Sequence, residues 1–136
     1  MQIDLPDVKT QQAKIYEAAT LYAIEELKKN LQAPVLAGQT YVDEDLYPRT
    51  HLLRELEGFE SPNPEIVKAY FKHFMEHFKD YNTEVKLAKL LGLSSSRRIR
   101  AFKEGSKAVP YDVWRHFLVL TGRVPQDIIP VLAFMA

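Results

Sequence analysis

Residues 83–105 read TEVKLAKLLGLSSSRRIRAFKEG and carry the signals of two short helices joined by a tight turn. Thr83 is a favoured N-cap residue, so the first helix is expected to begin there. Gly92 can adopt the left-handed backbone conformation that ends a helix without steric cost. A second helix follows the three serines and is expected to end at Gly105. The stretch therefore predicts a helix, a turn and a second helix.

The two predicted helices differ in the side chains that they expose. In the first, Val85, Ala88 and Leu91 recur at helical spacing, which predicts one apolar face. In the second, Ile99 and Phe102 are expected to be buried, so the neighbouring basic residues point outward. These outward residues are Arg97, Arg98 and Arg100. A helix, a glycine turn and a basic second helix make up the helix-turn-helix motif that reads DNA.

Charge is distributed unevenly along a chain whose formal net charge is zero. Residues 82–123 hold nine lysines and arginines against three acidic residues. Residues 1–81 hold nine against fourteen. This asymmetry predicts a surface for a polyanion on one part of the protein only.

Composition excludes several classes of protein. The 136 residues include no cysteine, which removes disulfides, thiolate zinc sites and cysteine nucleophiles and fits a cytoplasmic protein. The chain has no run of about 18 apolar residues and no secretory signal pattern, so no membrane association is expected. His73 and His77 stand four apart but lack a third ligand, so an exposed pair is favoured over a metal site. No cofactor and no enzymatic activity are expected, because no nucleophile–base pair, phosphate-binding glycine loop or carboxylate cluster is present.

The first sixty residues predict a helical region of their own. Residues 7–31 have a broad apolar stripe at helical spacing, which either packs on the same chain or forms the interface of a homodimer. Residues 33–47 are interpreted as a loop, and a short helix is expected between Pro48 and Gly58.

Two further helices and an apolar tail are predicted after residue 60. Asn63 and Pro64 form a clear helix start, and the helix is expected to run to residue 79. Pro110 opens another helix, which ends before Gly122. A last short helix is expected over residues 126–133, and its apolar side chains must be buried in the core or in a partner subunit.

Residues from about 65 to 122 resemble the phage-repressor-like helix-turn-helix family, also called the Xre or lambda-repressor-like class. The features that carry the resemblance are Ala88, Gly92, Ile99, Phe102, the ending Lys103-Glu104-Gly105 and the following Val109-Pro110. Residues 109–124 are also similar to small regulators found on plasmids and phages. The resemblance implies an all-α fold in which residues 61–136 form a five-helix DNA-binding domain and residues 1–60 precede it. The five helices would span residues 65–79, 83–91, 95–104, 110–121 and 126–133.

The turn is one residue longer than the family pattern. The family places six positions between the turn glycine and the buried aliphatic residue of the reading helix, whereas Gly92 and Ile99 are seven apart. Ser95, Ser96 and Arg97 are therefore all candidates for the N-terminal end of that helix.

The predicted DNA contacts fall into two groups. Arginines on helix 95–104 can donate to guanine O6 and N7 in the major groove, and serine hydroxyls can donate to bases or phosphates. The first group is Arg97, Arg98, Arg100, Ser95 and Ser96. The second group, placed for phosphates, is Thr83, Lys103 and Lys107. The competing interpretation is that the arginines form only a solvated face.

These observations favour a sequence-specific transcriptional regulator of double-stranded DNA. The resemblance implies a repressor. It also implies a homodimer, because members of the family usually dimerise and read two DNA half-sites. A different class is also consistent with the chain, namely a protein-interaction module such as an antitoxin that binds its partner through residues 1–60. RNA binding is disfavoured because the aromatic residues occur at core spacing.

Overall fold

The computed structural model describes residues 7–135, which are all-α: they contain five α-helices and no β-strand. The chain forms two compact units. One is the helical domain Gly38–Ile128, and the other consists of residues up to Ala37 together with residues from Ile129 onward. Among the described residues, no helix combines the length and the apolarity that a bilayer crossing requires.

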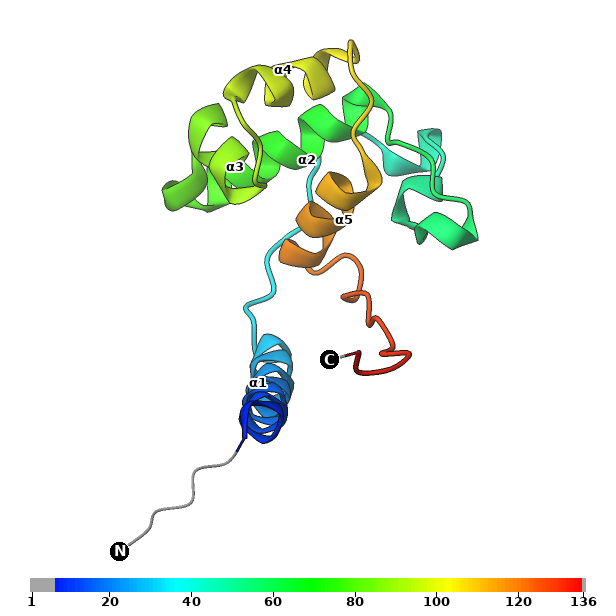
Figure 1. The fold of residues 1–136 in the computed structure, drawn as a ribbon. Helices are drawn as coiled ribbons and strands as arrows, with labels where there is room; N and C mark the ends of the chain where they lie inside the picture. The colour runs from blue at the N-terminus through cyan, green and yellow to red at the C-terminus, as the bar shows by residue number, and fades with distance from the viewer. Residues whose placement is uncertain (1–6, 136) are drawn as a thin grey trace, which may run out of the picture. The chain divides into compact units, whose positions relative to one another are not determined.

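Four of the predicted helices are confirmed in the helical domain (Figure 1). They are α2 (Pro64–His77), α3 (Glu84–Leu90), α4 (Ser96–Glu104) and α5 (Tyr111–Leu120). Local signals place their ends. The Asn63 side chain accepts a hydrogen bond from the Glu65 amide at 2.9 Å, with Pro64 as the first helical residue. The element order therefore follows the sequence punctuation up to residue 120.

A core rich in aromatic side chains joins the four helices, and α3 contributes Leu87 and Ala88 to it. Trp114 of α5 is fully buried and stacks on Tyr70 of α2 with ring centroids 5.6 Å apart. Phe71 packs edge-on against Phe117 at 5.0 Å, and α4 adds Phe102 to the same cluster. Such a core gives the domain a rigid frame on which surface residues are held in place.

Val85, which the helical spacing places on the predicted apolar face, is exposed instead. Val85 is 62% exposed because Leu87 and Leu91, spaced four apart, set the inward face of α3, and Val85 lies two residues before Leu87 on another face. Leu120, at the last position of α5, is 44% exposed, whereas Val113 in the first turn of the same helix is buried.

Residues 38–60 belong to the helical domain, whereas the sequence predicts that they form part of a separate N-terminal region. The helix predicted after Pro48 is not α-helical: two 3₁₀ turns, Thr50–Leu52 and Glu55–Glu57, replace it. Leu53 lies between them in an extended conformation, with ψ of 157°, and this breaks helical continuity. The segment returns to the core because Leu52 and Phe59 pack against it.

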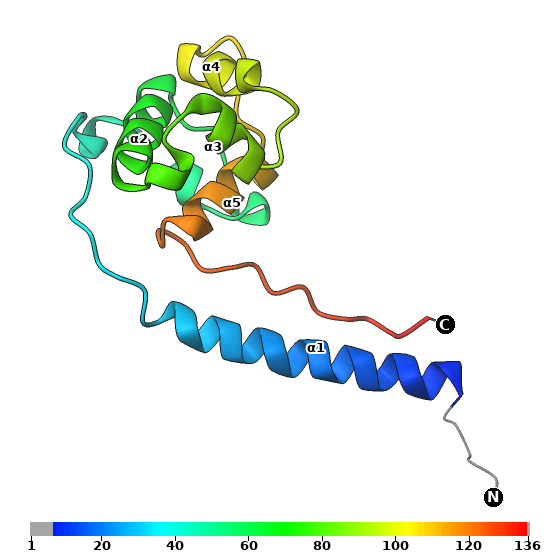
Figure 2. The same ribbon diagram turned by 90° about the vertical axis from the view of Figure 1, so that its left-hand side faces the viewer.

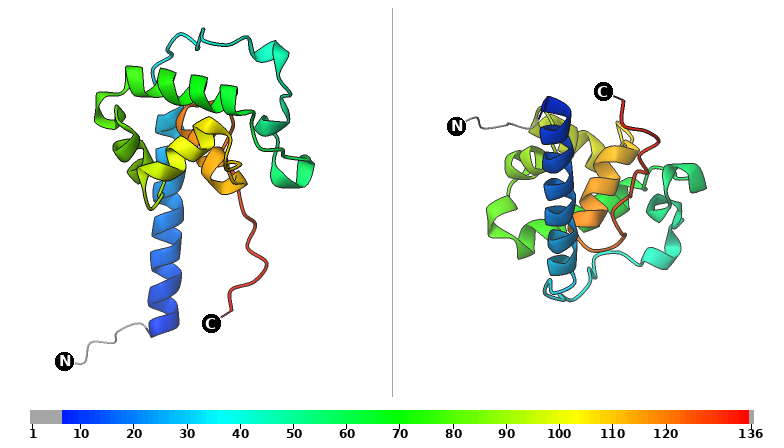
Figure 3. Two further views of the ribbon diagram at one scale, coloured as in Figure 1. Left: turned by 90° about the horizontal axis from the view of Figure 1, so that it is seen from above. Right: turned by 60° about the horizontal axis from the view of Figure 1, so that its bottom comes forward.

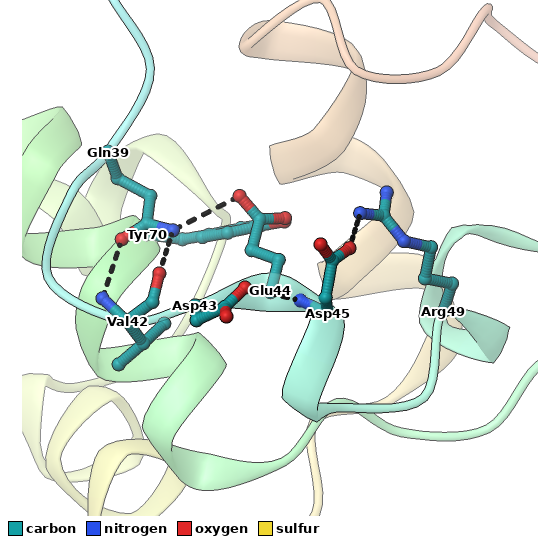
Figure 4. Close-up of polar contacts among 7 residues, drawn as sticks. All are labelled: Gln39, Val42, Asp43, Glu44, Asp45, Arg49 and Tyr70. Carbon is teal, nitrogen blue, oxygen red and sulfur yellow. Dashed lines mark hydrogen bonds and ion pairs between the residues drawn. The ribbon is translucent and has the colours of Figure 1, made fainter.

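The acidic loop before these turns is tied to α2 (Figure 4). Gln39 Nε2 donates to the Val42 carbonyl at 2.9 Å and to Glu44 Oε2 at 3.1 Å. The Tyr70 hydroxyl donates to the other Glu44 oxygen. Burial opposes ionisation of Glu44, but the hydrogen bonds from Tyr70 and Gln39 outweigh it and lower the pKa of this carboxyl group. Burial, followed by the Glu44 contact, raises the pKa of Tyr70. The Glu44 carboxylate therefore has a structural role, because it holds this acidic loop against α2.

His51 is a buried histidine that sequence reasoning did not identify. It is 4% exposed, and Trp114 Nε1 donates a hydrogen bond to His51 Nδ1 at 3.1 Å. The ring also lies edge-on to Tyr70. Burial lowers the pKa of His51 to about 4, and the hydrogen bond from Trp114 requires an unprotonated Nδ1.

We expect the domain to lose stability as the pH falls from about 6.5 towards 4. The unfolded chain takes up the His51 proton near pH 6.5, whereas the folded chain takes it up only near the lowered pKa of about 4. The unfolded state therefore binds more protons in this window and is favoured as the pH falls, by up to about 3 kcal/mol. Urea unfolding at pH 7 and pH 5 measures the effect. A His51→Gln variant with the same pH dependence as the parent would contradict it.

The helix predicted over residues 126–133 is wrong, because residues 123–135 contain no helix. Pro130 lacks an amide hydrogen and its ring clashes with the preceding turn, which prevents the helix from continuing. Asp127 instead anchors this segment: its carboxylate pairs with Arg115 at 3.2 Å and with Arg54 at 3.3 Å and accepts from the Tyr111 hydroxyl at 2.7 Å. The predicted five-helix domain thus contains four α-helices.

The other unit contains α1 (Val8–Asn30), which confirms the predicted N-terminal helix. Asp7 caps it by accepting from the Thr10 amide at 2.7 Å. α1 is one uninterrupted helix (Figure 3), and none of its residues is buried. The segment after Ile128 runs beside it (Figure 2), where Tyr16 meets Phe134 edge-on at 4.9 Å. The apolar tail is exposed in the single chain, with Leu132 at 97%, so the predicted burial in the core is wrong. Its burial in a partner subunit stays a prediction.

Candidate nucleic-acid interface

The turn between α3 and α4 is fixed by its backbone. The Gly92 amide donates to the Lys89 carbonyl at 3.1 Å, and the Leu93 amide donates to the Ala88 carbonyl at 2.8 Å. This pair of bonds is the Schellman arrangement, and Gly92 supplies the required positive φ of 71°. Leu93 is buried directly after the glycine, so the turn is pinned to the core. The direction in which α4 leaves α3 is therefore well determined.

α4 begins at Ser96, with Ser95 at its N-cap position. The Ser95 side chain makes no capping hydrogen bond and is exposed, while Ser96 is half-buried. At the other end, Gly105 closes the helix with φ of 83°, and a Cβ there would lie 2.7 Å from Pro64 Cγ. Among the candidates for the N-terminal end, Ser96 is thus the first helical residue.

The inward and outward faces of α4 follow the predicted pattern. Ile99 is fully buried and Phe102 is 2% exposed, as predicted. Arg97 and Glu104 are both exposed and, being seven residues apart, share the face opposite this pair. Arg98 lies to one side, where its guanidinium carbon is 5.5 Å from the centroid of the Phe102 ring.

Glu84 of α3 binds two of the predicted DNA-contact residues. Its Oε2 atom lies 3.5 Å from Arg100 Nε, and its Oε1 atom lies 3.1 Å from Lys103 Nζ. Both partners come from α4, so one carboxylate joins the two helices of the motif. No periodic pattern in the sequence indicates these pairs, because they link residues on different helices.

The remaining predicted contact residues differ in how free they are. Thr83 caps α3, with its hydroxyl oxygen accepting from the Lys86 amide at 3.2 Å. Lys107 and Arg97 are exposed, and neither side chain has a partner among residues 7–135. The structure therefore groups the arginines and Ser95 on the surface of α4 and gives Thr83 and Lys103 structural contacts.

Two cations counted in the basic segment do not contribute to this surface. Arg115 is only 7% exposed and donates to the carbonyls of Leu52 at 3.3 Å and Pro125 at 3.0 Å. The Arg123 guanidinium lies over the Tyr70 ring at 3.9 Å from the centroid. The basic surface is therefore narrower than the residue count implied and is centred on α4.

Residues 7–135 offer little for other kinds of site. No three histidine, aspartate or glutamate side chains in this part of the chain form a group that could hold a metal ion. His77 Nδ1 lies 2.8 Å from the His73 carbonyl, within the same helix. Comparison of the chain with protein-family models, curated proteins and solved structures finds no match.

Proposed function

We propose that the protein is a sequence-specific regulator of transcription that inserts α4 into the major groove of double-stranded DNA. One observation carries the proposal: α4 follows a fixed glycine turn, buries Ile99 and Phe102, and presents arginines on its exposed side. A helix held in this way can enter a groove as a rigid body without refolding. The repressor role rests on the resemblance to phage repressors.

The arrangement suggests a division of labour among the exposed cations. Arg97 points away from the domain near the N-terminal end of α4, where helix-turn-helix proteins contact base edges. A guanidinium there can donate two parallel hydrogen bonds to guanine. Lys107, just beyond the end of α4, suits a phosphate, which contributes affinity and salt dependence without sequence preference.

The experiment that tests the proposal is selection of bound duplexes from a random DNA pool with the full chain. Enrichment of one motif that contains guanine in each half-site is the expected result. A pool that stays random after several rounds, at low salt as well as at physiological salt, would contradict the proposed function.

We expect the protein to be a homodimer, because one reading helix covers only one half-site. The surface formed by α1 and the tail supports this proposal, since Ile15, Tyr22 and Leu132 are each more than 65% exposed. Large exposed apolar patches on a protein surface mark sites of association with other molecules. Light scattering at micromolar concentration is expected to give twice the chain mass of 15.7 kDa. The monomer mass, with and without DNA, would exclude the dimer.

The exposed apolar side chains of α1 also favour a second candidate, a module that binds a partner protein in the manner of an antitoxin. Its distinguishing result is a single stoichiometric partner in a pull-down that is lost on Tyr22→Glu and retained on Arg97→Ala. DNA selection without enrichment, together with that result, would favour this function over the first.

A further inference from the structure

Glu84 occupies an unusual position for an acidic residue in a DNA-reading motif. It is the first residue of α3, yet its carboxylate contacts the middle and the end of α4. Its side chain is 30% exposed, compared with 54% for Arg100 and 26% for Lys103. The carboxylate is therefore at the boundary between the core and the proposed DNA surface.

The atoms that Glu84 uses leave the reading end of Arg100 available. The carboxylate faces Arg100 Nε. Guanine is recognised by two parallel N–H donors, and the terminal Nη1 and Nη2 atoms provide such a pair. Lys103 donates to the other carboxylate oxygen at 3.1 Å, so the Glu84 carboxylate is itself held from a second side.

This contact distinguishes Arg100 from Arg97. Arg97 has no partner among the described residues and must lose its rotamer freedom when it binds. Arg100 is already restrained by its ion pair with a carboxylate on a neighbouring helix. A guanidinium that is ordered before binding loses less conformational entropy in the complex, and it tolerates fewer positions of the base.

We propose that Glu84 is a positioning residue that fixes the Arg100 guanidinium for one guanine in each half-site, and so determines specificity at that base pair. The inference rests on the proposed function. The negative charge of Glu84 is also expected to weaken the attraction of the protein to DNA phosphates at every sequence. Glu84 thus exchanges general affinity for discrimination.

Glu104 offers a matched control for the charge. It is exposed on α4, and it has no side-chain partner among residues 7–135. Glu84→Gln and Glu104→Gln each remove one negative charge from the same motif, but only the first removes the contact with Arg100. A pure charge effect changes both variants alike.

The test compares the wild-type full chain with both variants by selection from random DNA, followed by competition binding on the enriched duplex and on its single-base variants. Glu84→Gln is expected to lose about threefold to tenfold of its preference for guanine at one position per half-site, a part of what a complete bidentate contact gives. Glu104→Gln is expected to keep the wild-type preference. Both should bind unrelated duplexes slightly more tightly. Adding Glu84→Gln to Arg100→Ala should cause no further loss at that position.

Three outcomes overturn the inference. The first is a Glu84→Gln variant with the base preferences of the wild type, and the second is equal loss of preference in both variants. The third is a loss in Glu84→Gln that persists unchanged on top of Arg100→Ala. Thermal unfolding followed by circular dichroism shows whether each variant is folded, so that a structural defect is not read as lost specificity. Wild-type protein that enriches no motif would refute the proposed function itself, before any variant is compared.

Discussion

Replacing Arg97 and Arg100 by alanine is expected to abolish specific DNA binding while leaving the domain folded. Both side chains are exposed, so neither contributes to the core. Each guanidinium that reads a guanine contributes about 1–3 kcal/mol of discrimination, so the pair accounts for about 2–6 kcal/mol, or roughly thirtyfold in affinity at the least. Fluorescence anisotropy on the selected duplex measures the loss.

A matched control separates sequence reading from simple loss of positive charge. Lys9 and Lys14 are exposed on α1, and replacing both by alanine also removes two cations. This control is expected to weaken binding by less than about threefold, because α1 is not part of the proposed reading motif and charges on exposed side chains are screened by salt. Unchanged binding in the arginine double variant, or an equal loss in the control, would show that α4 does not read DNA.

Trp114→Ala is expected to destabilise the helical domain by about 3–5 kcal/mol, the usual cost of deleting a large buried aromatic side chain. Trp114 is fully buried, stacks on Tyr70 and donates the hydrogen bond to His51. Domains of ordinary size have only about 5–15 kcal/mol of total stability, so the variant is expected to lie close to unfolding at 25 °C.

Urea unfolding of the full chain measures this loss. It is monitored by far-ultraviolet circular dichroism, which reports helix content and does not require the tryptophan that the variant lacks. Leu120→Ala on the same helix is the control, because Leu120 is 44% exposed and should cost less than about 1 kcal/mol. A Trp114→Ala midpoint equal to that of the control would contradict the aromatic core as the main source of stability.

The helices of the domain could be predicted because their ends are set by local chemistry. Asn63 with Pro64, Thr83, Gly92 and Gly105 each act on backbone groups within a few residues, so the sequence carries the signal directly. The failed predictions depended on more distant contacts or on competing local effects. The helix expected over residues 126–133 does not form, because Pro130 disfavours it and Asp127 is held by Arg115, Arg54 and Tyr111.

The candidate site was only partly predictable for the same reason. Spacing within α4 correctly separated the buried pair Ile99 and Phe102 from the exposed arginines. The contacts of Glu84 with Arg100 and Lys103 span 16 and 19 residues and join two different helices, so the periodicity within one helix does not predict them. The hydrogen bond between His51 and Trp114 joins residues 63 positions apart, and it forms because the 3₁₀ turn Thr50–Leu52 packs on the core.

An NMR titration of the ¹⁵N-labelled full chain with the selected duplex tests the central claim most directly, because it reports each backbone amide separately. Saturable shifts are expected in residues 95–104 and at Lys107, together with smaller shifts at the start of α3. Amides of α1 between Val8 and Asn30 are expected to be unaffected by the DNA. Shifts confined to α1, or no saturable shift at α4, would contradict the assignment of α4 as the DNA-reading helix.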